Sequence, residues 1–370
     1  MPDMNLSFPT RVIYGMDTFS KLGTVVSDVA TRALIVTESA MHVEEYLQAA
    51  IHSLEERGIE SIVFSDIPPA VSTVAVNEAA DLVRVSKPQA VVGLGGMRVL
   101  SAARLAAHKG KSRTGTAPVC IEVPTSCRNH TLFRNEAVIT DAESSLPMIV
   151  PIPPGVLHTI LVDPALTYSL SPRYFAVAVL DTLLASIEGY MSDHANFLSD
   201  TYLERAIQLL GDALTLMMRN PEDSMARNKS SEAGLLSAMG LGSTSQGVGG
   251  ALSSVINSTR KVPKSWVSAV MLPHILELYI KDQPVKLARI AEWLGEDVHG
   301  RHPETVAQSA AKAARRIIGT LDLPARLRDL NLSLSELGEI SSLAHAQPSS
   351  KTLPFRLTTD SLYEVIKSAF

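Results

Sequence analysis

Short apolar runs alternate with amphipathic stretches over the first part of the chain. Two stretches, 43–56 and 71–85, carry apolar residues at helical spacing. Five β-branched runs around them predict strands, at residues 32–37, 61–64, 90–95, 119–124 and 159–164. Strands that alternate with helices indicate a mostly parallel sheet, and continuously apolar runs fit strands covered on both faces. Residues 1–162 are therefore predicted to form a Rossmann-like α/β domain.

The pattern changes after residue 162, where the strand signals stop. Three stretches place apolar residues on one helical face, at residues 201–218, 307–318 and 334–345. Ser333 with Glu336, and Ser361 with Glu364, have capping-box spacing and predict helix starts. Residues 163–370 are predicted to form an all-helical domain. We expect a small-molecule ligand to bind in the cleft between the two domains.

Composition narrows the class of protein. The chain has 370 residues, of which 46% are hydrophobic and 19% charged, and this fits a globular protein with two cores. A net charge of −5 predicts no nucleic-acid or anionic-membrane partner, and no apolar run is expected to span a bilayer. The N-terminal sequence has neither a basic n-region nor an apolar h-region, so no secretory signal is expected. We expect a cytoplasmic protein in which Cys120 and Cys127 are reduced, small apolar residues.

The stretch VVGLGGMRVLSAARLAA, at residues 91–107, has the form of an altered phosphate-binding turn. An apolar strand runs into Gly95 and Gly96 and then into a helix, which is how backbone N–H groups reach a pyrophosphate. Met97 and Arg98 follow at positions where such a turn needs small residues. The strand and the helix are kept, and the phosphate cradle is compromised.

Many short segments along nearly the whole chain are similar to segments of one known protein family, and they occur in the same order and at similar spacing. They are residues 8–23, 32–40, 91–96, 123–141, 160–172, 179–192, 240–255 and 271–275. In these segments the chain resembles the iron-containing alcohol dehydrogenase family, within the group that includes dehydroquinate synthase and glycerol dehydrogenase. The resemblance implies a dehydroquinate synthase-like fold and NAD(P)-linked oxidation or reduction of a small alcohol or carbonyl compound. It also implies a homo-oligomer, a dimer or larger, in which residues 10–15 can pair across subunits.

The resemblance implies two cofactor loops, and both are altered in this chain. The family's GGGS-type turn, with an aspartate and a lysine after it, reads Gly95, Gly96, Met97, Arg98, and then Ser101 and Arg104. The family's PTTAGTGSE-like loop reads PTSCRNHTL at residues 124–132, so that Arg128, Asn129 and His130 replace GTG. The cofactor-binding positions that match are Gly95, Gly96, Thr125 and Ser126. Losing glycines removes the close backbone approach that they allow.

Charged residues at the cofactor positions leave two interpretations open. Arg98 and Arg128 can hold a phosphate or carboxylate with side-chain forks, or they are surface arginines over a disused cleft. Glu38 occupies the place where an acidic residue in relatives contacts the adenosine ribose, which favours NAD over NADP. An acid after a strand is also a common first-turn residue of a helix.

The metal site that the resemblance implies is incomplete. In the family an aspartate and three histidines hold a divalent metal, and this chain has Asp181, Ala185, Gly250 and Lys264 at those positions. This set cannot bind a transition metal, so no metal is expected. Lys264 is predicted to pair with Asp181, either as a structural charge pair or as electrophile or proton donor to a carbonyl. His130 lies near the cleft by resemblance and is the third candidate catalytic residue.

Three functional hypotheses remain open. The first is a metal-independent, NAD(P)-linked oxidoreductase of a small carbonyl or alcohol, similar in its lack of metal to the maleylacetate reductases. The second is a catalytically inactive family member, a pseudoenzyme that binds a ligand or partner. The third is altered chemistry on an anionic substrate in the same cleft, with Lys264, Arg98, Arg128 and His130 supplying positive or proton-transferring groups.

Overall fold

The computed structural model describes residues 9–39, 41–68, 70–111 and 117–370. The chain divides into two compact units, Met1–Leu170 and Ser171–Phe370, and each is described by itself. The predicted boundary after residue 162 precedes a 3-10 turn, η2 (Pro164–Ser169), which the structure assigns to the first unit. In that turn the Ala165 carbonyl accepts a hydrogen bond from the Tyr46 hydroxyl of the first unit. Residues 1–8, on which the absence of a secretory signal was predicted, lie outside the described residues.

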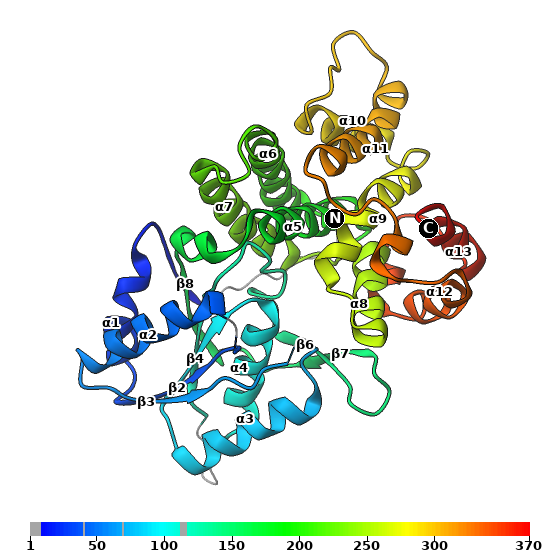
Figure 1. The fold of residues 1–370 in the computed structure, drawn as a ribbon. Helices are drawn as coiled ribbons and strands as arrows, with labels where there is room; N and C mark the ends of the chain where they lie inside the picture. Colours follow the sequence, from blue (N-terminus) through cyan, green and yellow to red (C-terminus); the bar gives the residue numbers. More distant parts are fainter. Residues whose placement is uncertain (1–8, 40, 69, 112–116) are drawn as a thin grey trace. The chain divides into compact units, whose positions relative to one another are not determined.

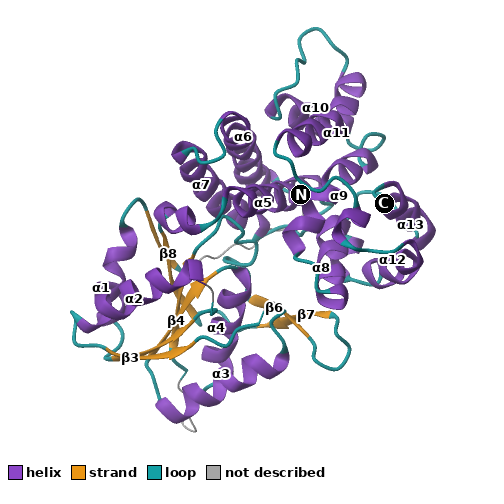
Figure 2. Ribbon diagram, viewed as in Figure 1, coloured by secondary structure: helices purple, strands orange, loops and turns teal. Residues whose placement is uncertain are grey.

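The first unit is built on a six-stranded sheet in which every pair of neighbours is parallel (Figures 1 and 2). The strand order is β1-β8-β5-β4-β2-β3. The strands are β1 (Arg11–Tyr14), β2 (Arg32–Val36), β3 (Glu60–Phe64), β4 (Ala90–Gly95), β5 (Val119–Pro124) and β8 (Leu157–Val162). All five runs predicted as strands are confirmed. The parallel sheet and the helical second unit confirm the predicted fold class.

Helices cover both faces of this sheet. They are α1 (Leu22–Ser27), which follows η1 (Thr18–Lys21), α2 (Met41–Glu55), α3 (Thr73–Ser86) and α4 (Met97–Lys109). Val92 of β4 lies in the core cluster that α1 and α2 share with the strands. Gly93, on the opposite face, packs against α4 so closely that a Cβ would lie 2.8 Å from the Ala103 Cβ. The sheet is thus covered on both faces, as its continuously apolar strands predict.

One feature of the first unit was missed from the sequence, and one prediction about this unit is not tested by the structure. An antiparallel pair, β6 (Glu136–Thr140) and β7 (Pro147–Pro151), lies outside the main sheet and was missed from the sequence. Strand β1 pairs with β8 at the edge of the sheet, where Val12 and Tyr14 are 39% and 42% exposed. Its pairing across subunits stays a prediction.

The second unit contains helices and no β-strand among its described residues. The long helices are α5 (Pro172–Met191), α6 (Phe197–Arg219), α7 (Ser224–Leu241), α8 (Val248–Arg260), α9 (Lys264–Leu278), α10 (Pro284–Trp293), α11 (Pro303–Thr320), α12 (Leu337–His345) and α13 (Thr359–Ser368), joined in part by η3 (Leu327–Leu330), η4 (Leu334–Glu336) and η5 (Pro348–Lys351). The capping box of Ser333 and Glu336 is confirmed. The one predicted from Ser361 and Glu364 is wrong, because Thr358 caps α13 and accepts a hydrogen bond from the Ser361 N–H at 3.1 Å.

Helix α5 is the central helix of the second unit and packs against α6, α7, α8 and α9. It is long and apolar enough to span a membrane by composition alone, which the sequence analysis had not expected, but 94% of its apolar window is buried within the fold. A core helix surrounded by other helices needs this apolar composition on every side. Cytoplasmic localisation stays a prediction.

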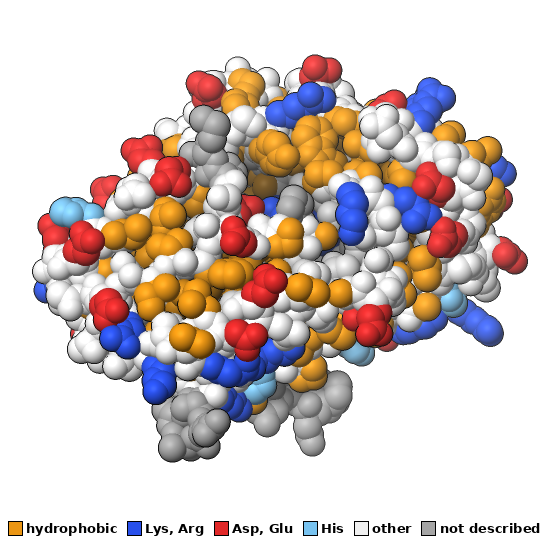
Figure 3. Space-filling model, turned by 60° about the horizontal axis from the view of Figure 1, so that its bottom comes forward, with side chains coloured by type: hydrophobic (Ala, Val, Ile, Leu, Met, Phe, Trp, Pro, Cys, Tyr) orange, Lys and Arg blue, Asp and Glu red, His pale blue; other side chains and the backbone are white. Residues whose placement is uncertain are grey.

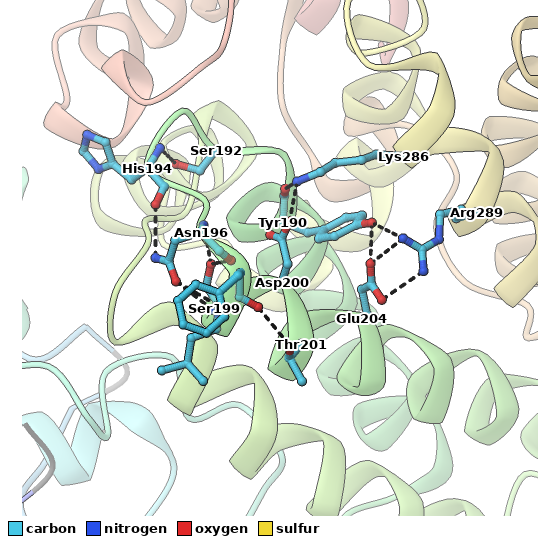
Figure 4. Close-up of polar contacts among 12 residues, drawn as sticks. Tyr190, Ser192, His194, Asn196, Ser199, Asp200, Thr201, Glu204, Lys286 and Arg289 are labelled. Atoms are coloured by element: carbon cyan, nitrogen blue, oxygen red, sulfur yellow. Dashed lines mark hydrogen bonds and ion pairs between the residues drawn. The ribbon is translucent and has the colours of Figure 1, made fainter. Parts of the chain in front are cut away.

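A polar network fixes the C-terminal end of α5 to α6 and α10 (Figure 4). The Tyr190 hydroxyl donates to Glu204 at 2.8 Å, and Arg289 donates to both oxygens of the same carboxylate at 2.6 and 3.0 Å. Lys286 lies 4.1 Å from the Tyr190 ring centroid and donates to the Tyr190 carbonyl at 2.6 Å. It also bonds Asp200 at 3.1 Å. These contacts hold α5 in one position relative to its neighbours.

Charged side chains of both signs lie on the surface of the protein. Acidic, basic and hydrophobic side chains share the face drawn in Figure 3. Ion pairs at such positions, for example Arg32 with Glu60 at 2.7 Å, join side chains that are 41% and 59% exposed. Exposed pairs of this kind each contribute at most about 1 kcal/mol, so the buried charges have the larger structural effect.

Arg104 and Glu122 form a buried ion pair in the first unit. Their side chains are 3% and 0% exposed, and two N–H···O bonds of 2.8 and 2.7 Å join the guanidinium to the two carboxylate oxygens. The third guanidinium nitrogen donates to the carbonyls of Thr131, Arg134 and Glu136 at 3.0, 2.9 and 3.2 Å. Arg104 therefore holds the whole connection between β5 and β6 against the sheet.

Glu188, a residue of α5, is a second buried carboxylate. Its side chain lies against the N terminus of α8. It accepts hydrogen bonds from the N–H groups of Gly249 and Gly250 at 2.6 and 2.9 Å. A Cβ on Gly247 would lie 2.7 Å from its Oε1, so glycine is needed there for the close approach. Burial raises the pKa of Glu188 to about 7, against the opposing effect of these backbone bonds and of Lys264.

Replacing Arg104 by lysine tests the buried fork. Lysine keeps the charge but cannot make two parallel bonds to Glu122 and also reach the carbonyls of the loop. We expect Arg104→Lys to lower the free energy of unfolding by about 2 kcal/mol. Denaturant unfolding followed by circular dichroism measures this. Arg84→Lys, at a side chain that is 48% exposed, is the control and should change stability by less than about 0.5 kcal/mol. Equal effects of the two changes would contradict the structural role of the fork.

The raised pKa of Glu188 predicts a pH-dependent stability. Because the folded-state pKa of about 7 lies above the ordinary glutamate pKa of 4.5, the contribution of Glu188 to stability is fully present below pH 4.5 and is lost as the pH rises through 7. Glu188→Gln cannot ionise and removes this loss. We expect the unfolding free energy of wild type, relative to this variant, to fall by about 2 to 3 kcal/mol between pH 5 and pH 8. Urea unfolding across this range measures it, and a constant difference would show that Glu188 is ionised throughout.

Candidate functional site

The structure brings together the two residues that the sequence analysis paired in the helical unit. Lys264 is the first residue of α9, directly after Pro263, and Asp181 lies in the middle of α5. The Lys264 Nζ lies 2.8 Å from the Asp181 Oδ1, and the side chains are 10% and 0% exposed. Ala185, one turn after Asp181 on α5, is buried and small. The charge pair is therefore present, and its catalytic role stays a prediction.

The residues at the family's metal positions do not fit a divalent metal. Asp181 is bonded to an ammonium, which has donors only and is no metal ligand. Ala185 and Gly250 have no side-chain ligand atom at all. Within the described part of the chain, no group of three or more His, Cys, Asp or Glu side chains is placed to hold a metal ion. Asp181 has instead gained the positive charge of Lys264, which offsets the cost of burying a carboxylate.

Glu188 adds a second carboxylate to this region and was missed from the sequence. It follows Asp181 on α5 by seven residues, about two helical turns, so the two lie on the same side of the helix. The charge of Lys264 also acts on Glu188, although burial is the dominant influence on its pKa. A carboxylate seven residues after Asp181 in an otherwise apolar helix was the signal that could have identified it.

The turn after β4 keeps the helix N terminus of a phosphate-binding turn. Gly95 has a φ of +157°, and a Cβ there would lie 2.8 Å from the Val99 side chain. Gly96 is the N-cap of α4, no side chain caps this helix, and a Cβ on Gly96 would meet no atom within 4 Å. An uncapped helix N terminus offers its N–H groups and the positive end of its dipole to an anion. The first turn of α4 therefore fits a phosphate despite Met97.

Glu38 and Arg98, predicted to contact two different parts of the cofactor, bind each other. The Arg98 Nη2 donates to the Glu38 Oε2 at 2.8 Å, and the Arg98 Nη1 donates to the Pro68 carbonyl at 3.0 Å. The side chains are 38% and 16% exposed. Arg98 thus partly neutralises the acid that was expected to repel a 2′-phosphate. Their contacts to a cofactor stay predictions.

The second cofactor loop, after β5, is packed into the first unit. The Thr125 N–H donates to the Gly95 carbonyl at 3.1 Å and ties this loop to the turn after β4. The Arg128 N–H donates to the Ser126 Oγ at 3.4 Å, and Arg128 is half-buried. His130 is 4% exposed. The residues that replace the family's glycines are thus inside or at the edge of the fold rather than on a free surface.

Two buried polar atoms in these segments fit a polar ligand. The Ser101 Oγ and the Asn129 Oδ1 have no hydrogen-bond partner among the described residues. Ser101 lies in α4, and Asn129 follows β5, so each belongs to one of the two segments assigned to the cofactor. Buried polar groups normally have a partner, and a bound molecule is one source of it.

The predicted residues therefore fall into two groups. The cofactor candidates and His130 belong to the first unit, and Lys264 and Asp181 belong to the second. Within the first unit the structure joins Glu38 to Arg98 and Thr125 to Gly95. Cys120 and Cys127 are both buried and reduced, as the sequence predicted.

Comparison with known proteins covers both units. The model for "Iron-containing alcohol dehydrogenase" matches residues 9–164, and the model for the C-terminal part of the "Fe-containing alcohol dehydrogenase family" matches residues 175–370. A choline dehydrogenase of Bacillus subtilis is 25% identical, over 98% of this chain and 94% of its own. An NAD-dependent methanol dehydrogenase of Bacillus methanolicus is 22% identical, over 99% of each chain.

A solved structure agrees with these sequence matches in fold. The alcohol dehydrogenase of Oenococcus oeni superposes with a TM-score of 0.92, at 19% identity, over 100% of both chains. This likeness by itself shows the fold. The two family models together match most of the sequence, and the chain therefore belongs to the iron-containing alcohol dehydrogenase family.

Proposed function

We propose that this member of the family is an NAD(P)-linked oxidoreductase that acts on a small alcohol or carbonyl compound without a transition metal. The observation that carries the proposal is the buried bond of 2.8 Å between Lys264 and Asp181. It supplies a positive charge at a position where the family resemblance implies a metal ligand. The similarity to dehydrogenases of choline and methanol supports a small alcohol or its carbonyl product as substrate.

Lys264 has the chemistry to replace a metal as the group that acts on the substrate oxygen. An ammonium has three N–H donors, and one is used by Asp181. A second can donate to a carbonyl oxygen, drawing electron density from the carbon, and can pass a proton to the oxygen as it becomes an alcohol. In the direction of oxidation the neutral amine takes that proton back. Asp181 keeps the ammonium in place, and the nicotinamide, when bound, accepts or supplies the hydride.

The residues of the first unit would bind and select the dinucleotide. The N terminus of α4, with Gly96 as its N-cap, is suited to the pyrophosphate. Arg98 donates to the Oε2 of Glu38, so the Oε1 of Glu38 can accept a ribose hydroxyl. We therefore retain a preference for NAD over NADP, moderated by the positive charge of Arg98.

A non-catalytic role is the second candidate and also has an observation in its favour. Arg98 and Glu38 satisfy each other in the absence of a cofactor, and Met97 and Arg98 replace small residues of the turn. A cofactor site that is no longer used would show such mutual pairing. The third hypothesis, chemistry on an anionic substrate, uses the same arginines. Binding of the cofactor separates the first candidate from the other two.

Calorimetric titration with NADH and NADPH is the decisive experiment. We expect chelator-treated protein, with its metal content measured, to bind NADH with a Kd in the micromolar range and NADPH more weakly. Glu38→Gln should narrow the preference for NADH by about tenfold, because it removes the acid and leaves Arg98 to meet a 2′-phosphate. Failure of the metal-free protein to bind either cofactor would contradict the proposal and favour the non-catalytic role.

Replacing Lys264 by methionine tests the charge pair in stability and in catalysis. Lys264→Met removes the ammonium from a carboxylate that is 0% exposed, so we expect the unfolding free energy to fall by about 3 kcal/mol. Lys229→Met is the matched control, because Lys229 pairs with Asp212 over the same 2.8 Å but with side chains 28% and 57% exposed. It should lose less than about 1 kcal/mol.

The catalytic part of this test uses carbonyl reduction with NADH. Any substrate found by screening should lose at least about a hundredfold in kcat with Lys264→Met, while NADH binding is unchanged. A variant that is destabilised but keeps its kcat would show that the pair is structural only. Unchanged stability and unchanged activity together would remove the charge pair from the proposal altogether.

A further inference from the structure

The helical unit contains a cavity of about 590 Å³ that the proposed function does not use. It lies among the start of α5, the connection between α8 and α9, the start of α9, and the segment from η3 to η4. Its charged and aromatic lining residues are Arg173, Arg260, Lys261, Trp266, Asp329 and Glu336. The volume falls in the range of small-molecule sites, about 300 to 1,000 Å³.

The two acids of this cavity are already bound by other groups. Glu336 accepts a hydrogen bond from the Ser333 N–H at 2.7 Å and forms an ion pair with Arg260, whose Nε lies 2.6 Å from its Oε1. The hydrogen bonds from Ser333 and the positive charge of Arg260 hold the pKa of Glu336 below the usual value. Asp329 accepts from the Arg326 N–H at 3.0 Å. Glu336 is therefore engaged by Arg260, and Asp329 completes a cap and retains its negative charge in the lining.

The cations Arg173 and Lys261 of this cavity differ from Glu336 in their charge partners. Neither makes an ion pair with a carboxylate among the described residues, and both are exposed. The Arg173 guanidinium lies 5.1 Å from the centroid of the Trp266 ring, and the Lys261 ammonium donates to the Ser258 carbonyl at 3.0 Å. The cavity thus presents two positive groups without acidic partners beside an aromatic ring.

We propose that this cavity binds a small carboxylate with an aromatic or conjugated body. A carboxylate matches the planar fork of Arg173, and a flat body can stack on Trp266. The remaining lining is largely apolar and gives the body an apolar surface, with Val262, Pro263, Pro324, Leu330 and Leu332 beside the polar Asn331. Inorganic phosphate would satisfy the cations but would leave this apolar surface uncovered, so the lining favours an organic anion.

The two tryptophans of the chain allow a direct binding measurement. Trp293→Phe removes the indole that lies against Tyr190 and Arg289, so that Trp266 alone reports. Titration of this full-length variant with phenylacetate should change the fluorescence of Trp266 in a saturable way. Phenylacetamide, which has the same shape without the charge, should bind at least about tenfold more weakly.

Arg173→Gln, made in the same background, should weaken phenylacetate binding by about tenfold or more. Arg205→Gln is the matched control and should leave binding unchanged. Arg205 is an exposed residue of α6 that does not line the cavity, and among the described residues its side chain bonds only Gln208, at 3.5 Å. Circular dichroism checks that the variants fold, and the comparison of acid with amide needs no charge variant. NADH binding by Arg173→Gln should equal that of its parent, so failure here is distinguishable from failure of the proposed function.

Three results would overturn the proposal. They are the absence of a saturable response of Trp266, equal binding of phenylacetate and its amide, and equal weakening by Arg173→Gln and Arg205→Gln. Displacement of phenylacetate by inorganic phosphate at equal concentration would also overturn it, because the site would then be a simple anion site without preference for the organic body.

Discussion

The ion pair between Lys264 and Asp181 is the constraint on which the centre of the helical unit depends. Helix α5 is apolar and enclosed, and a carboxylate that is 0% exposed inside it requires a positive charge nearby. The family resemblance implies that a metal supplies this charge in relatives, whereas in this chain a lysine supplies it. Ala185 and Gly250 bring no side-chain ligand atom, and Lys264 bonds the Asp181 carboxylate directly. A lysine at a position where the resemblance implies a metal ligand thus provides a charge partner for the retained aspartate.

Helix α5 contains a second buried carboxylate, and this one is stabilised in a different way. Glu188, two turns further on, has no cation bonded to it and is held by the N–H groups at the start of α8. These bonds stabilise the ionised form less than burial destabilises it, which is why its pKa is raised to about 7. The network around Tyr190 then fixes the end of the helix. Rigid anchoring at this end keeps Asp181 in position for Lys264, which is what a preorganised site requires.

The sequence predicts those parts of the structure that depend on local periodicity. The five strand runs and the three helical stretches formed as expected because burial on both faces, or on one helical face, leaves a regular apolar pattern. Strands β6 and β7 were missed because they are short and pair only with each other, and because β7 begins and ends with Pro147 and Pro151, which weaken a strand signal. The Lys264–Asp181 pair was predicted by comparing ligand positions with the family. The fork of Arg104 on Glu122 and the N-terminal cap by Glu188 were not, since their partners come together only through tertiary packing.

A common change in charge runs through both units. Positions at which the family resemblance implies contacts to a metal or a phosphate now carry Lys264 and Arg98, and each binds an acid of the same chain. The two pairs have different consequences for function. Arg98 and Glu38 are partly exposed, so a ribose or phosphate can compete with their bond at small cost. Lys264 and Asp181 are buried, and separating them is costly, so under the proposed function a substrate would use the ammonium while it stays bound to Asp181. If the proposed function holds, changes at Glu38 and Arg98 would alter cofactor selection without disturbing the Lys264–Asp181 pair.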